Sequence, residues 1–159
     1  MSSQPSLAAP AREWLEDRAW TWDEDEDADG LVLAVISGTG DDDWRWYIQV
    51  RDEHHQLALF TILASPVPLD RRPEMSQMVV TASFGLTVGS FELDLDEGQL
   101  RFRTSIGFGG AEVSNAQVRS LLDEMERTNR AMVKGYWPAI TAVLEGRPGV
   151  EAVRGVEGP

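Results

Sequence analysis

The chain has 159 residues, of which 27 are acidic and 14 are basic, so its formal net charge at pH 7 is −13. This length predicts a single domain, and a hydrophobic share of 42% is sufficient for a buried core. The absence of cysteine excludes disulfide bonds, thiolate zinc sites and cysteine nucleophiles. The strong acidity argues against nucleic-acid binding, because neutralisation of phosphates requires a basic surface.

No segment is long and apolar enough to predict a membrane span. The longest apolar run, residues 31–36, has six residues, whereas a helix that crosses a bilayer needs about 20. The segment from Met1 to Trp20 lacks the apolar core of a signal peptide. These observations predict a cytoplasmic protein that interacts with neither membranes nor nucleic acids.

The N-terminal part of the chain predicts a short helix and an acidic loop. Residues 1–9 are small or polar, and we expect them to be disordered. A helix is expected from Pro10, since proline suits a first turn and the apolar residues that follow have helical spacing. Residues 23–29 (DEDEDAD) contain six acids in seven positions, and their mutual repulsion predicts an exposed loop.

Three strands are predicted after the acidic run, at residues 31–37, 44–51 and 56–64. The first and the third are apolar at successive positions, which is typical of strands covered on both faces. The middle strand alternates, with Trp44 and Trp46 on one face and Tyr47 on the other. Because the connections are too short for crossover helices, the three strands are expected to form an antiparallel meander.

Two further helices are predicted in the second half of the chain. Pro73 in a first turn and Gly85 as a left-handed residue after a last turn delimit the first of them. The second begins at Ser114, which has the spacing of a capping box with Gln117, and its apolar residues then keep helical phase. Pro138 lies inside this helix and predicts a kink or a division into two helices.

A hairpin is predicted between these helices, at residues 91–105. If its turn lies at an acidic segment with a glycine, Glu92 is opposite Arg103 and Asp94 is opposite Arg101. This register places charged side chains on one face and apolar ones on the other, and a slip by one residue would break the pattern. The charged ladder is therefore interpreted as sheet pairing rather than as a catalytic site.

The order α-βββ-α-ββ-α predicts an α+β fold, in which helices pack on an antiparallel five-stranded sheet made of the meander and the hairpin. We expect a single domain over residues 10–146. The Gly-rich segment 147–159 is expected to be a flexible tail.

The second half of the chain contains several short motifs. They are residues 82–85 (ASFG), 89–94 (GSFELD), 96–98 (DEG), 101–105 (RFRTS), 136–140 (YWPAI) and 142–146 (AVLEG). In this order the motifs resemble those of the YbjN-like family of bacterial sensory transduction regulators. One departure is Ser83, where many members have asparagine.

The resemblance implies a fold similar to that of type III secretion chaperones, which are small α+β proteins that often dimerise and bind segments of partner proteins. It therefore implies a non-catalytic protein-binding module, chaperone-like or a regulatory adaptor, that forms a homodimer and binds a segment of an unidentified partner protein. Neither a catalytic residue nor a cofactor is expected.

Aromatic residues supply the candidates for partner binding. The chain has six tryptophans, and packing in the core is the simplest role for each. Tryptophan and tyrosine are nevertheless enriched in binding hot spots. If helices cover only one face of the sheet, one of the two side-chain sets of the middle strand is exposed. The candidate partner-binding residues are Trp14, Trp44, Trp46 and Tyr47.

An alternative function is that of a small-ligand or metal-ion sensor, which would use the acidic loop 23–29 or a pocket between sheet and helices. Asp25, Asp27 and Asp29, followed by glycine, match the first half of an EF-hand loop. However, the twelfth position, where the motif requires a bidentate glutamate, is Ile36. These three aspartates are thus a weak candidate metal site, and a solvated acidic loop is the simpler interpretation.

Overall fold

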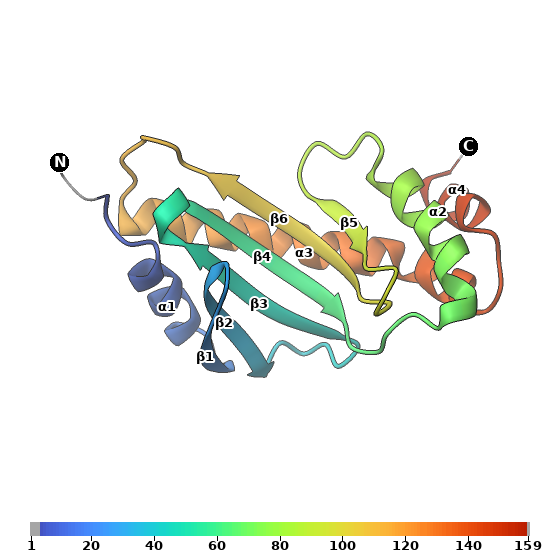
Figure 1. Cartoon of the computed structure of the whole chain (residues 1–159), viewed down its shortest axis with the longest axis horizontal. Helices are drawn as coiled ribbons and strands as arrows, with labels where there is room; N and C mark the ends of the chain where they lie inside the picture. Colours follow the sequence, from blue (N-terminus) through green and yellow to red (C-terminus); the bar gives the residue numbers. More distant parts are fainter. Residues whose placement is uncertain (1–3, 159) are drawn as a thin grey trace.

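A computed structural model of the chain describes residues 4–158, and the predicted disorder of residues 1–3 and of Pro159 lies outside this part. One antiparallel sheet has the strand order β1-β2-β3-β4-β6-β5 (Figure 1). The helices are α1 (Ala8–Glu16), α2 (Arg72–Ser83), α3 (Asn115–Leu144) and α4 (Gly149–Glu157). The strands are β1 (Thr21–Asp27), β2 (Gly30–Ser37), β3 (Trp44–Arg51), β4 (Gln56–Leu63), β5 (Ser90–Leu93) and β6 (Leu100–Gly107).

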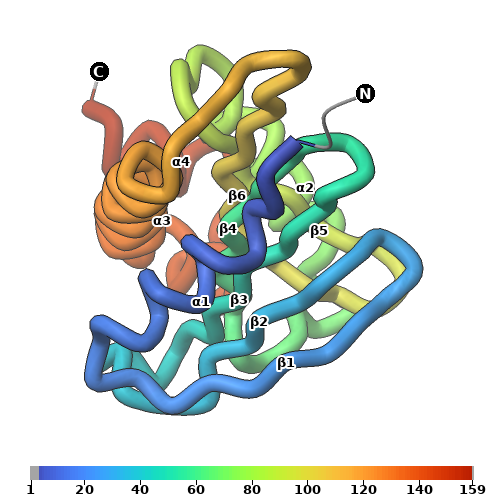
Figure 2. The backbone as a smooth tube through the Cα atoms, turned by 90° about the vertical axis from the view of Figure 1, so that its left-hand side faces the viewer, coloured from blue at the N-terminus to red at the C-terminus, as the bar shows by residue number. Residues whose placement is uncertain are grey.

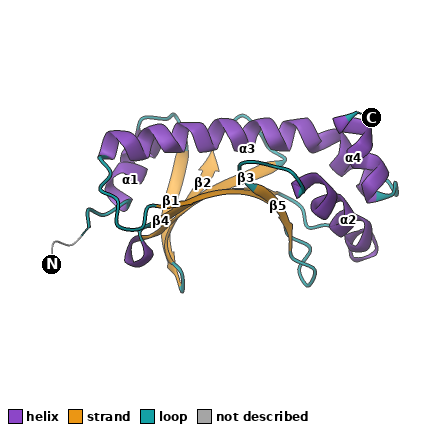
Figure 3. Cartoon of the chain, turned by 90° about the horizontal axis from the view of Figure 1, so that it is seen from above, coloured by secondary structure: helices purple, strands orange, loops and turns teal. Residues whose placement is uncertain are grey.

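The helices lie on one side of the sheet and leave the other side uncovered. Figure 3 shows an arched sheet with α3 along its outer side and no helix under the arch. The helix α1 packs against α3, and Figure 2, in which α3 is seen end-on, shows α1 between α3 and the first strands. At the opposite end, α2 and α4 pack on each other, and α2 also contacts β5. We call the two sides of the sheet the covered face and the open face.

The long helix α3 begins with the predicted capping box. Ser114 Oγ accepts a hydrogen bond from Gln117 N at 3.2 Å, and the Gln117 side chain accepts one from Ser114 N at 2.8 Å. The helix remains a single element through Pro138, so of the two outcomes predicted for this proline a division into two helices does not occur. The buried side chains of α3 form a stripe along the whole helix, and this stripe packs on the covered face.

The core on the covered face consists of two apolar clusters, one beneath α1 and the first half of α3, the other beneath α2, α4 and the second half of α3. Between them, the fully buried Asn129 of α3 makes four hydrogen bonds to strands, of which the longest, at 3.5 Å, goes to Phe102 O. Its amide donates to Leu59 O at 3.1 Å and to Thr61 Oγ1 at 3.0 Å, and its carbonyl accepts from Thr104 Oγ1 at 2.9 Å. This buried polar site fixes α3 on β4 and β6 because every alternative position would leave the amide unpaired.

The sheet has six strands rather than the five predicted, because residues 21–27 form the edge strand β1. The prediction of a loop was based on charge repulsion, but seven register pairs with β2 outweigh it. Successive side chains of a strand point to opposite faces, which separates neighbouring carboxylates. In addition, Arg12 donates two hydrogen bonds of 2.7 Å to Glu24, and these hydrogen bonds lower the pKa of the Glu24 carboxyl.

Both ends of the described chain are more ordered than predicted. The helix α1 begins at Ala8, and Leu7 is only 1% exposed, although residues 1–9 were expected to be disordered. The segment expected to be a flexible tail contains α4, which buries Ala152 and Val153 against the core. Two glycines in a short segment weaken the helical signal, and contacts with α2 and α3 supply the missing stability.

The hairpin of β5 and β6 has a register two residues away from the predicted one. Glu92 pairs with Arg101, and Phe91 pairs with Phe102. Asp94 lies outside the strand, where its carboxylate accepts hydrogen bonds from the backbone of Asp96 and Glu97 in the turn, which lowers its pKa. A shift by two leaves every side chain on its predicted face, so the hydrophobic pattern alone cannot distinguish the two registers.

The two edge strands of the sheet are protected from pairing with other strands in different ways. At β5, Ser83 Oγ accepts a hydrogen bond from Phe91 N at 2.9 Å and donates to Phe91 O at 3.3 Å, so the end of α2 satisfies the outward backbone groups of this residue. At β1, five successive side chains are acidic, from Asp23 to Asp27. Charged edge strands resist pairing with other strands.

Candidate functional site

Three of the four predicted partner-binding residues lie in the core of the covered face. Trp14, Trp44 and Trp46 are 2%, 4% and 1% exposed, whereas Tyr47 points to the open face. The alternation of β3 was therefore predicted correctly, and the structure decides which set helices cover. The three buried tryptophans do not form a surface in this chain.

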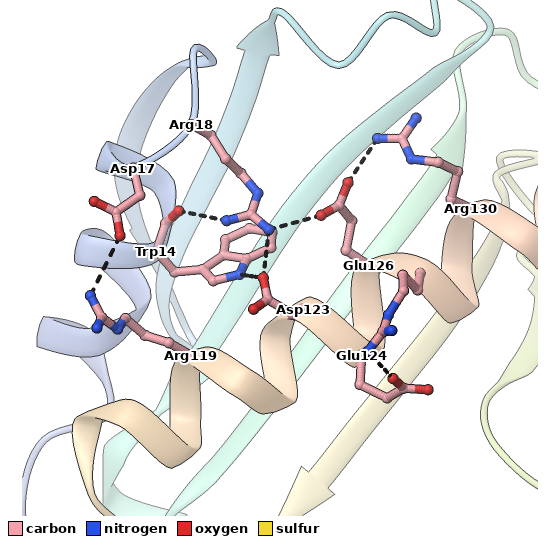
Figure 4. Close-up of polar contacts among 9 residues, drawn as sticks. Trp14, Asp17, Arg18, Arg119, Asp123, Glu124, Glu126 and Arg130 are labelled. Atoms are coloured by element: carbon pink, nitrogen blue, oxygen red, sulfur yellow. Dashed lines mark hydrogen bonds and ion pairs between the residues drawn. The ribbon is translucent and has the colours of Figure 1, made fainter.

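Trp14 is part of a polar network that attaches α1 to α3 (Figure 4). Its indole Nε1 donates to Asp123 Oδ1 at 2.9 Å, and the guanidinium of Arg18 lies over its ring at 3.4 Å. Arg18 also donates to Asp123 at 2.8 Å and to Glu126 at 2.9 Å. Burial acts to raise the pKa of Asp123, but hydrogen bonds from Arg18 and Trp14 outweigh it, and the pKa is lowered. The contacts of Trp14 therefore serve to hold α1 against α3.

The other two tryptophans pack against aromatic rings of neighbouring segments, one in a T-shaped and one in a tilted arrangement. The ring centroid of Trp44 is 5.8 Å from that of Trp137 in α3, and the ring centroid of Trp46 is 6.3 Å from that of Trp20. Arg130 of α3 lies over the ring of Trp46 at 5.0 Å. These contacts are typical of core aromatic residues.

The centre of the open face is an aromatic stack on β3 and β4. The rings of Tyr47 and Phe60 are parallel within 17°, and their centroids are 4.4 Å apart. The guanidinium of Arg101 lies over the Phe60 ring at 4.5 Å and donates to the Tyr47 hydroxyl at 3.1 Å. Burial is the main cause of a raised pKa of Tyr47, and Arg101 opposes it. Phe60 is thus 5% exposed although no helix covers it.

Around this stack, the open face is apolar in the middle and charged toward β6 and β1. Small or aliphatic residues of β2 and β4 surround the two rings. On β6, Arg101 and Arg103 both bond to Glu92, each with a shortest distance of 2.7 Å. The open-face residues of β1 are acidic. The apolar members are Val32, Ala34, Ile36, Ala58 and Ile62.

A hollow of about 190 Å³ lies beside the stack, over β4. It exists because Ala58 and its neighbours on β6, Ser105 and Gly107, have small side chains or none. The side chains of Arg51 and Arg103 line it, 35% and 40% exposed. The open face therefore combines an apolar centre, an accessible aromatic edge and a hollow lined by arginines, which are properties of a recognition surface.

The predicted weak metal site is not assembled as a cation cage. Asp25 and Asp27 lie in β1, and Asp29 lies in the turn that follows. Asp25 accepts a hydrogen bond from Glu26 N, and Asp27 accepts one from Asp29 N, each at 2.8 Å. Within residues 4–158, no group of three or more potential ligands is arranged to hold a metal ion.

Sequence reasoning did not identify Phe60, Arg101 and Arg103 as members of a surface. Phe60 lies in a run that is apolar at successive positions and was interpreted as covered on both faces. The arginines were interpreted as partners of acids within a hairpin, which they are. Only the position of β6 next to β4, which the sequence pattern does not reveal, brings them beside Tyr47 and Phe60.

Comparison with solved structures shows the same fold in a bacterial protein. The "Crystal structure of YbjN, a putative transcription regulator from E. coli" is 14% identical, with a TM-score of 0.58, and the match covers 82% of this chain and 91% of that one. The "Structure of the HopA1-SchA Chaperone-Effector Complex" is 18% identical, with a TM-score of 0.46, and covers 79% of this chain and 86% of that one. For the "Crystal Structure of the ExsC-ExsE Complex" the values are 18%, 0.32, 67% and 79%.

Comparison with sequences gives a family. No curated protein matches the chain. Between Gln4 and Gly158, no helix has the length and hydropathy needed to cross a membrane. A family model described as "Putative bacterial sensory transduction regulator" matches residues 12–151, and this span includes all six strands and α3. The chain therefore belongs to the YbjN family.

Proposed function

We propose that this protein is a non-catalytic protein-binding module, chaperone-like or a regulatory adaptor, which binds a segment of a partner protein on the open face of its sheet. The observation that carries the proposal is the uncovered face itself, with an aromatic stack and aliphatic residues at its centre. Exposed apolar surfaces of this kind mark interaction sites in soluble proteins. The family description as a regulator is consistent with such a role. The proposal includes a cytoplasmic location.

Among the four residues predicted for partner binding, Tyr47 is the one that this proposal retains at the surface. Trp14, Trp44 and Trp46 would act indirectly, because they hold the helices and the sheet in place behind the open face. Their replacement would change partner binding through loss of the fold, not through loss of a direct contact.

The proposal also includes a homodimer. Residues 75–91 contain no charged residue, although 26% of the chain is charged. On the outer side of this segment, Val80, Phe84 and Val88 are 70%, 90% and 55% exposed. Two copies that each carry a net charge of −13 can approach most closely at an uncharged surface. Light scattering should give the mass of a dimer for the wild type and of a monomer for Phe84→Asp.

Partner binding can be tested by capture with two matched variants. Ala34→Glu places a bulky charge in the middle of the open face, opposite Tyr47, without removal of a core side chain. Leu69→Glu makes the same kind of change at a residue that is 74% exposed and lies in the turn before α2. A partner from the native lysate should be retained in stoichiometric amount by the wild type and by Leu69→Glu, but not by Ala34→Glu. Equal retention by all three chains would contradict the assignment of the open face.

A further inference from the structure

The hollow over Ala58 differs in charge from the rest of this acidic surface. Its lining contains two arginines, polar residues and apolar residues, but no carboxylate. A larger hollow of about 310 Å³ beside the turn between β1 and β2 is lined by five acids and one arginine. In a chain with 27 acids and 14 bases, an acid-free hollow lined by two cations is a local reversal of the overall charge. Such a reversal determines which side chains a partner can place there.

The two arginines retain capacity for a further hydrogen-bond acceptor. Arg51 Nε is buried without a hydrogen-bond partner in the described part of the chain. Its Nη1 donates to Gln56 Oε1 at 3.3 Å, and its Nη2 lies 3.7 Å from Asp29 Oδ1. Arg103 forms an ion pair with Glu92, with Nε 2.7 Å from Oε1 but without the angle of a hydrogen bond, and its terminal nitrogens take no part in this pair. A guanidinium has five N–H donors in a planar fork that matches a carboxylate. A carboxylate between Arg51 and Arg103 would use guanidinium donors that Asp29, Gln56 and Glu92 leave unpaired.

We propose that this hollow binds the carboxylate of an acidic side chain in the partner segment, while a neighbouring apolar side chain of that segment packs on the Tyr47–Phe60 stack. The hollow is smaller than pockets for small molecules, which measure roughly 300–1,000 Å³, but it can accept one side chain. This inference rests on the proposed function, and the partner that it implies is a peptide segment with an acidic residue beside an apolar one.

The same geometry explains how an acidic protein can select an acidic segment. Away from the hollow, the net charge of −13 repels such a segment. Entry of the acid into the hollow is therefore favoured, because there two arginines and no carboxylate face it. The arginines thus determine the position of the partner along the sheet.

The test uses a library of random peptides displayed on phage and selected on the full chain, followed by synthetic peptides and fluorescence anisotropy. Enriched peptides should contain Asp or Glu beside an apolar residue. Conversion of that acid to its amide should weaken binding at least about tenfold, the cost of one charge-assisted hydrogen bond. Arg103→Gln should also weaken binding of the acidic peptide, but it should cost the amide peptide nothing further, because the interaction with Arg103 is already lost there.

Two further variants separate the hollow from general charge and from folding. Arg45→Gln removes an exposed arginine on the same face of β3 that does not line the hollow, and it should leave affinity unchanged. Ala58→Leu fills the hollow without a change of charge, and it should weaken binding at least about tenfold, as expected for a side chain that is excluded from its pocket. Circular dichroism of each variant checks the fold.

Three results would overturn the inference. If enriched peptides lack acids but lose affinity for Ala34→Glu, the open face binds partners and the hollow does not recognise a carboxylate. If inorganic phosphate competes as well as an acidic peptide, the hollow binds free anions. If no peptide is enriched, the inference fails together with the proposed function.

Discussion

The covered face and the open face of the sheet each contain a phenylalanine that is almost inaccessible, but for different reasons. Phe102 of β6 is 0% exposed because α2, α3 and β5 contribute side chains over it. Phe60 of the neighbouring strand β4 is 5% exposed because Tyr47 and Arg101 lie over its ring. The covering groups of Phe102 are held by a helical layer, whereas those of Phe60 are two side chains of the same sheet.

This difference shows that low exposure has two meanings in one domain. A residue covered by a second layer belongs to the core, and its removal leaves a cavity. A residue covered by neighbouring side chains can be uncovered when these side chains change rotamer, at little cost to the fold. The second type of cover is suited to a surface that must adapt to a partner.

The largest expected effect is on the covered face. Phe102→Ala should lower the free energy of unfolding by about 3–5 kcal/mol, because the surrounding layer cannot collapse into the space. Urea denaturation followed by tryptophan fluorescence measures this loss. If Phe102→Ala lowered the free energy of unfolding by less than Phe60→Ala does, the distinction between the covered face and the open face would be wrong.

Asn129 tests whether the covered face depends on polar as well as apolar contacts. Asn129→Ala removes four hydrogen bonds, those with the side chains of Thr61 and Thr104 and with the carbonyls of Leu59 and Phe102. We expect a loss of about 2–3 kcal/mol in the free energy of unfolding, since buried unpaired groups are costly. As a control, Asn129→Asp retains the size of the side chain but cannot donate to Leu59. Stability equal to the wild type in both variants would show that the site is dispensable.

On the open face, Phe60→Ala should cost about 1–2 kcal/mol, less than in a core, because Tyr47 and water can fill the space. The same variant should lose partner affinity, whereas Phe102→Ala, where it remains folded, should retain it. Parallel denaturation and binding measurements would then separate the two faces. A cost equal to that of Phe102→Ala would show that both residues belong to the core.

The smallest expected effect involves two tyrosines on opposite sides of the molecule. Burial and a hydrogen bond to Glu157 raise the pKa of Tyr136 from 10.0 to about 12. The folded state therefore binds its proton more tightly, so this contribution to stability is complete below about pH 10 and is lost as the pH rises to about 12. At about pH 11, the wild type should have lost about 1 kcal/mol relative to Tyr136→Phe.

Tyr47→Phe is the matched control for this titration. The pKa of Tyr47 is also raised, but by burial opposed by Arg101, which stabilises the ionised form. We expect a smaller change with pH from this residue. A titration of stability that is unchanged in Tyr136→Phe would contradict the assignment to the bond with Glu157.

Local signals in the sequence predicted elements whose formation depends on local physics. The alternation of β3 gave its bounds, Trp44 and Arg51, and the pair of Ser114 and Gln117 gave the start of α3. The strand β1 was missed because its formation depends on pairing with β2, which overrides an unfavourable composition. The helix α4 was missed for a similar reason, since contacts with α2 and α3 stabilise it.

The sequence predicted that one face of β3 is exposed if helices cover only one side of the sheet, but it did not show which face. The pattern showed that Trp46 and Tyr47 face opposite sides, but the choice between them depends on where α3 lies. The proximity of Arg103 to Phe60 depends on strand order, because β6 pairs with β4 across a long connection. Residues brought together by tertiary topology leave no local periodic signal.

The two closed edges of the sheet respond differently to acid. At β5, closure depends on neutral hydrogen bonds between Ser83 and the backbone of Phe91, which persist at low pH. At β1, closure depends on carboxylates, and acid that neutralises them leaves a row of unpaired backbone groups without electrostatic protection. Acid would therefore expose unpaired backbone groups at β1 only, and this edge, which is distinct from the surface of the proposed homodimer, would join one homodimer to the next.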